Sequence, residues 1–140
     1  MKNLISLSKI KSELAFCHNN WTVIYGSYVY GEFIPEHSDI DVAIITRSKE
    51  KKKNLEIWDS YLEKIPSNYD LKIFELLPLF IQVDIIQKYI VIFGNPYEIS
   101  EYFYQYRKLW KDMVPRIKAN QFHNVQEKLN LIEHRKKVIG

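Results

Sequence analysis

Cysteine is almost absent from this sequence. Cys17 is the single cysteine among 140 residues, so the chain can form neither an internal disulfide nor a thiolate metal cluster. The four histidines are scattered, and no two of them have the i, i+4 spacing of a helical zinc site. We therefore expect a protein of a reducing cytoplasm that holds no zinc.

Long hydrophobic runs are also missing. Lys9, Lys11 and Glu13 interrupt the first apolar residues before they reach the length of a signal peptide or a membrane span. The composition, 46% hydrophobic and 26% charged, is typical of a globular chain and excludes a disordered or collagen-like one. We expect a soluble protein with no membrane partner. The net charge of +3 is compatible with a nucleotide or polyanion partner but does not require one.

The sequence does contain an alternation of strand and helix patterns. Four segments rich in β-branched and aromatic residues predict strands at about 21–25, 39–46, 69–76 and 89–93. Helical patterns precede, separate and follow them, and one of these helices is expected to begin at Pro78. The order predicts a single α/β (α+β) domain over residues 1–140, with a core of about 1–95. A helical C-terminal extension of about 97–138 is expected to break or kink at Pro115.

Two of these helices have a predicted buried face. In the first helix, apolar residues recur at steps of three and four: Leu4, Leu7, Ile10, Leu14 and Cys17. In the Lys-rich second helix the expected buried residues are Leu55, Trp58, Leu62 and Ile65. In the C-terminal extension, Val125, Leu129 and Ile132 have helical spacing and could bury a stripe against a partner, which includes a homodimer.

Two aspartates stand together in the second predicted strand. Successive side chains of a strand alternate, so Asp39 and Asp41 are expected on one face and Ile40 on the other. Like charges on neighbouring positions repel, and a divalent cation between them relieves the repulsion. Oxygen ligands favour Mg²⁺ or Mn²⁺. The spacing therefore predicts a metal site.

A small-residue turn follows the first predicted strand. Gly26 has no side chain, so backbone N–H groups can approach a phosphate there, and Ser27 adds a hydroxyl donor. Asp70, at the start of the third predicted strand, is the best candidate for a third carboxylate that accepts a proton or shares a metal. A phosphate cradle beside paired carboxylates indicates phosphoryl or nucleotidyl transfer with two metal ions about 3.5–4 Å apart.

The combined pattern resembles a known family. Gly26-Ser27, a spacer that contains Gly31, and Ser-Asp-Ile-Asp at 38–41 are similar to the signature of the minimal nucleotidyltransferases of the DNA polymerase beta superfamily. The likeness extends over about 21–110. It implies a mixed sheet with helices against one face, an NTP donor with ATP favoured, and pyrophosphate as product. The acceptor would be a protein or nucleic-acid hydroxyl. Some relatives adenylylate a tyrosine of a HEPN-domain toxin, as its antitoxin.

The resemblance assigns roles to particular residues. Two Mg²⁺ ions would be held by the catalytic aspartates Asp39, Asp41 and Asp70. The nucleotide would be bound by Gly26, Ser27, Ser38 and Lys72. Many relatives carry an arginine before the second glycine, where this chain has Tyr30.

Several alternatives stay open at this level. Lys72 could replace the missing arginine or serve as a structural partner of the carboxylates. Ser38 could form a turn rather than bind a ligand, and Asp70 could belong to turn chemistry. The whole chain could be a noncatalytic antitoxin with a degenerate site. Transfer to RNA or a small molecule is disfavoured, because the chain has no second domain to position such an acceptor, and a nucleic acid is not required.

Overall fold

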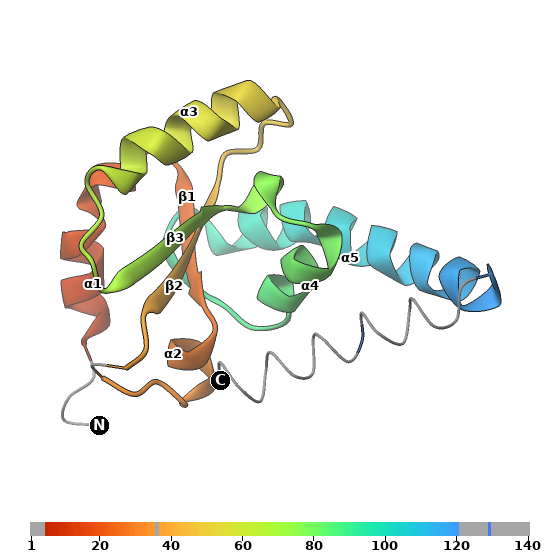
Figure 1. The fold of residues 1–140 in the computed structure, drawn as a ribbon, viewed down its shortest axis with the longest axis horizontal. Coiled ribbons are helices and arrows are strands. Elements are labelled where there is room, and N and C mark those ends of the chain that lie inside the picture. Colours follow the sequence, from red (N-terminus) through yellow and green to blue (C-terminus); the bar gives the residue numbers. More distant parts are fainter. Residues whose placement is uncertain (1–4, 36, 121–128, 130–140) are drawn as a thin grey trace.

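The computed structural model describes residues 5–35, 37–120 and 129, and for 116–120 only the course of the backbone. Figure 1 shows how the elements are arranged. The strands are β1 (Trp21–Tyr25), β2 (Ile40–Ile45), β3 (Tyr69–Ile73) and β4 (Ile90–Phe93). The helices are α1 (Leu7–Glu13), α2 (Ser27–Tyr30), α3 (Lys51–Leu62), α4 (Leu79–Gln87) and α5 (Pro96–Asn120), with short 3₁₀ turns η1 (Ala15–Cys17) and η2 (Phe74–Leu76).

The four strands form one mixed sheet in the order β3-β2-β1-β4. β1 runs antiparallel to both β2 and β4, whereas β2 and β3 are parallel. The last residue of β1 therefore lies at the same end of the sheet as the first residues of the other three strands. We call this the Gly26 end of the sheet, because Gly26 follows directly on β1. The predicted mixed sheet is confirmed, and its strand order brings distant segments of the sequence to one place.

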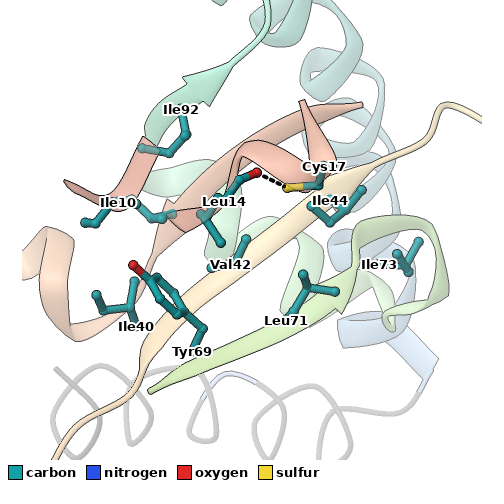
Figure 2. Packing of buried hydrophobic residues seen from close by; sticks show 11 residues of the cluster. Ile10, Leu14, Cys17, Ile40, Val42, Ile44, Tyr69, Leu71, Ile73 and Ile92 are labelled. Carbon is teal, nitrogen blue, oxygen red and sulfur yellow. Dashed lines mark hydrogen bonds between the residues drawn. The ribbon is translucent and has the colours of Figure 1, made fainter. Parts of the chain in front are cut away.

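Helices cover both faces of the sheet (Figure 1). On one face, α1, η1 and α3 cover a cluster that includes Leu14, Val42 and Leu71. Figure 2 shows this cluster, in which the buried Cys17 thiol donates a hydrogen bond to the Leu14 carbonyl. On the other face, α4 and α5 cover a cluster that includes Ala43 and Phe103. The expectation of helices against one face was wrong, because the strands bury apolar side chains on both sides.

The predicted face of the first helix is confirmed in part. Ile10, Leu14 and Cys17 are fully buried, but Leu7 is exposed. The α-helix ends at Glu13 and continues as the tighter η1, which changes the direction of the side chains. Leu4 lies outside the described residues.

The predicted buried face of α3 is confirmed in part, since Trp58 and Ile65 are partly buried and pack against the core. Leu55 and Leu62 are exposed, whereas Asn54 is buried. Asn54 accepts a hydrogen bond from the Thr46 hydroxyl at 2.6 Å and donates one to the Ser48 carbonyl at 2.8 Å. These bonds tie α3 to the end of β2, so a polar residue fixes which side of the helix faces inward.

The expected break at Pro115 is not seen, since α5 continues through this residue to Asn120. The stripe of Val125 and Ile132 falls outside the described residues, as does most of the predicted extension beyond 120. In the described part of the chain, no helix is both long and apolar enough to cross a membrane.

Truncating Phe74 tests the contact between the sheet and α5. This ring is fully buried, with its centroid 4.9 Å from that of Phe103 and 5.0 Å from that of Tyr106. We expect Phe74→Ala to lower the free energy of unfolding by about 3–5 kcal/mol, because the neighbouring side chains cannot fill the cavity that the ring leaves. Tyr104→Ala on the same helix is the control, since Tyr104 is 58% exposed, and should change stability by less than about 0.5 kcal/mol. Equal losses in urea unfolding would contradict this description of the core.

Candidate functional site

Two of the predicted aspartates lie next to each other at the Gly26 end of the sheet. The parallel register of β2 and β3 pairs Asp41 with Asp70. Both residues have the strand parity of Ala43, so their side chains leave the sheet on the face that α4 and α5 cover further along. Asp41 is half-buried, and the Asp70 side chain is 45% exposed. The structure thus brings together two carboxylates that are 29 positions apart in the sequence.

Gly26 is packed against the carboxylate of Asp41. β1 and β2 pair Tyr25 with Asp41, so the chain leaves β1 directly beside this side chain. A Cβ atom at position 26 would overlap Asp41 Oδ2. Gly26 also has a φ of +77° and a ψ of −149°, a backbone conformation that is essentially confined to glycine. Glycine is therefore required here by both the backbone and the neighbouring carboxylate.

Ser27 begins the four-residue helix α2 and is only 2% exposed. Its carbonyl accepts a hydrogen bond from Glu32 N–H at 2.9 Å, and Gly31 ends α2 in the left-handed conformation. As at any helix start, the first N–H groups have no acceptor within the helix. Gly26 and Ser27 are thus held in a tight turn beside Asp41, a geometry that suits the phosphate cradle predicted from the sequence.

Asp39 and Ser38 lie in the loop before β2, not in the strand. β2 begins at Ile40, and Asp39 is exposed. Ser38 Oγ accepts a hydrogen bond from Ile34 N–H at 3.2 Å, and Ser38 N–H donates to the Ile34 carbonyl at 2.8 Å. This geometry favours the turn-forming alternative for Ser38. Both residues line a hollow of about 400 Å³, together with Phe33.

Lys72 lies on the same face of β3 as Asp70. Its Nζ is 3.6 Å from Asp70 Oδ1, and both side chains are partly exposed. Such a pair contributes little to stability, about 0–1 kcal/mol, but it commits the ammonium group to a carboxylate. This contact favours the alternative in which Lys72 is a structural partner of the carboxylates rather than a nucleotide ligand.

A divalent cation fits the carboxylates that the structure brings together. Within the described residues, no group of three or more His, Cys, Asp or Glu side chains could hold a metal ion. Mg²⁺ does not require one, because it is usually bound by one or two carboxylates plus waters and substrate phosphates. Asp41 and Asp70, which are opposite each other in register, are the residues that would hold it.

Two residues near the site, Lys88 and Asp84, carry no signal in the sequence. The Lys88 ammonium lies 5.1 Å from the centroid of the Tyr30 ring. Burial raises the pKa of the Tyr30 hydroxyl, and the negative charges of Asp84 and Glu32 raise it further. Asp84 is itself buried in α4. The pattern of α4 and the turn after it indicates ordinary core packing, so only the fold places these two residues next to α2.

Glu75, the other acidic residue of the β3 region, has a structural role. It accepts hydrogen bonds from Thr46 N–H at 3.1 Å, from Arg47 N–H at 2.9 Å and from the Tyr102 hydroxyl at 2.7 Å. These bonds close the end of the sheet that lies opposite the Gly26 end. Glu75 is therefore not a rival to Asp70.

Comparison with known proteins identifies the family. The family described as Polymerase beta, Nucleotidyltransferase matches residues 8–98. A protein of Methanocaldococcus jannaschii named "Putative protein adenylyltransferase" is 45% identical over 109 residues, which cover 78% of this chain and 84% of that protein.

A solved structure has the same fold. It is described as a toxin-antitoxin with AMP-PNP, and it matches with a TM-score of 0.60 over 82% of this chain and 94% of that chain. At 18% identity this likeness concerns the fold alone. The family match covers well over half of the sequence and includes Gly26, Asp41 and Asp70. This chain therefore belongs to the polymerase beta family of nucleotidyltransferases.

Proposed function

We propose that this protein is a metal-dependent adenylyltransferase that moves AMP from ATP to an acceptor hydroxyl and releases pyrophosphate. The observation that carries the proposal is the pairing of Asp41 with Asp70 beside Gly26. The two carboxylates, which can bind a cation, thus lie next to a glycine turn that a phosphate can approach closely. Asp39, Asp41 and Asp70 are the proposed metal ligands, and Gly26 and Ser27 the proposed phosphate-binding residues.

The chemistry is an in-line displacement at the α-phosphorus of the nucleotide. The acceptor oxygen forms the new bond to phosphorus, and the bond to the oxygen that bridges to the β-phosphorus breaks. Two Mg²⁺ ions, when bound, would stabilise the charge on the attacking and leaving oxygens. Asp70 takes the proton of the acceptor hydroxyl, since its side chain is 45% exposed and accessible to an incoming group. Pyrophosphate leaves with the electron pair of the broken bond.

A protein hydroxyl is the proposed acceptor. The Methanocaldococcus jannaschii relative is named as a protein adenylyltransferase, and the matching solved structure is described as a toxin-antitoxin. These names support a protein acceptor and a toxin-antitoxin context, and the family resemblance adds a tyrosine of a HEPN-domain toxin as the proposed target, in a reducing cytoplasm. The protein would then act as an antitoxin by modifying its partner.

A noncatalytic antitoxin is the second candidate. It is favoured by the lack, among the described residues, of a group of three or more metal-ligating side chains, and by Tyr30. The two candidates differ in one outcome. If Asp39→Ala/Asp41→Ala still neutralises the partner toxin in growing cells, binding alone is sufficient; if neutralisation is lost while the complex persists, transfer is required.

Nucleotide binding is expected to depend on both the metal and the aspartates. We predict that the wild-type protein binds ATP with Mg²⁺, and that EDTA or Asp39→Ala/Asp41→Ala weakens binding at least about tenfold, because the bridging cation is lost. Calorimetric titration measures both effects. Asp59→Ala on the exposed side of α3 is the control and should bind as the wild type does. ATP binding that is unaffected by EDTA and by the double substitution would contradict the proposed site.

The overlap at Gly26 gives a second test with a matched control. Gly26→Ala is expected to abolish ATP binding, because its methyl group displaces the Asp41 carboxylate. Gly31→Ala also forces a positive φ on alanine, but no atom lies within 4 Å of the added methyl group. Gly31→Ala should lose about 1–3 kcal/mol of stability in urea unfolding from its backbone conformation alone, and Gly26→Ala should lose more, because the overlap with Asp41 is added. Only Gly26→Ala should lose the nucleotide, and equal ATP affinities of the two variants would refute the role of this contact.

A further inference from the structure

Lys88 lies at the Gly26 end of the sheet, shortly before β4. The antiparallel pairing of β1 with β4 joins Ile24 to Ile90. β4 begins at Ile90, so Lys88 lies two residues before this strand. Strand order puts β4 on the side of β1 that faces away from β2. Lys88 therefore lies at the Gly26 end of the sheet, and β1 separates it from the strand that carries Asp41.

The Lys88 side chain is directed by Tyr30. Its ammonium lies over the Tyr30 ring, 5.1 Å from the ring centroid. Tyr30 is the last residue of α2, and its N–H donates to the Gly26 carbonyl at 3.1 Å. A cation over an aromatic face is attracted by the negative charge density of the ring. The ring thus holds the charge of Lys88 beside the turn that contains Gly26.

The Lys88 side chain is exposed, and it forms no ion pair with any carboxylate of the residues that the structure describes. Lys72, by contrast, is 3.6 Å from Asp70. The nucleotide would bring several negative charges to an end of the sheet that already contains Asp41 and Asp70, so a cation is needed beyond the metal ions.

We propose that Lys88 binds the β- and γ-phosphates of the nucleotide, the part that leaves as pyrophosphate, and that Tyr30 is a positioning residue for it. This inference rests on the proposed function. The α-phosphorus must lie near Asp41 and Asp70, where the acceptor attacks. Lys88 is on the opposite side of β1, so it meets the distal end of the polyphosphate.

The test compares two nucleotides on the full chain. Lys88→Gln is expected to weaken Mg²⁺-ATP binding at least about tenfold, since a charge-assisted contact is lost. AMP has no distal phosphates, so its dissociation constant should change less than about twofold by the same reasoning. Lys88→Arg should keep most of the ATP affinity. Lys53→Gln, an exposed lysine of α3, is the matched control and should bind both nucleotides as the wild type does.

Tyr30 variants separate positioning from packing. Tyr30→Phe keeps the ring and should keep the ATP affinity, whereas Tyr30→Ala should lose part of it without affecting AMP. If the wild type binds Mg²⁺-ATP and Lys88→Gln binds it equally well, or loses AMP to the same extent, the role of Lys88 is overturned while the proposed function stands. If the wild type binds no ATP, the proposed function fails and this inference fails with it.

Discussion

The contact between Gly26 and the Asp41 carboxylate is the constraint on which the candidate site depends. β1 must end there, because the next residue adopts a backbone conformation essentially confined to glycine. The carboxylate occupies the space where any other side chain would begin. The same contact fixes where α2 starts and hence where Tyr30 lies relative to Lys88. Because Gly26 has no side chain, the proposed phosphate-binding turn, the proposed metal ligands and Lys88 can all lie at this end of the sheet.

The sheet supplies the rigidity that this arrangement requires. Its strands bury apolar side chains on both faces, under α1 and α3 on one side and α4 and α5 on the other. The ends of the strands are therefore held from two directions, and the two aspartates keep their register. At the opposite end, Glu75 accepts hydrogen bonds from Thr46 and Tyr102. The Gly26 end presents charged, partly exposed side chains such as Asp70 instead, and this placement of polar groups on a fixed scaffold is typical of an active site.

The sequence was sufficient for the existence of the four strands, because this depends on local composition and on alternation, but β3 ends at Ile73 and continues as η2 where a strand to 76 was expected. The inward side of α3 was predicted only in part: Trp58 packs against the core as expected, but Asn54 is buried by hydrogen bonds to a loop. The position of Lys88 depends on the pairing of β1 with β4, which joins segments more than 60 residues apart. Long-range pairing of this kind leaves no periodic signal, so only the fold could reveal it.

The most direct test of the account is a crystal structure of the protein with Mg²⁺ and an ATP analogue that has a methylene group between its α- and β-phosphates. We expect the α-phosphate beside Asp41 and Asp70, the triphosphate along the Gly26 turn, and its distal end toward Lys88. A nucleotide bound elsewhere, or at this place without contact between the metal and Asp41, would contradict it.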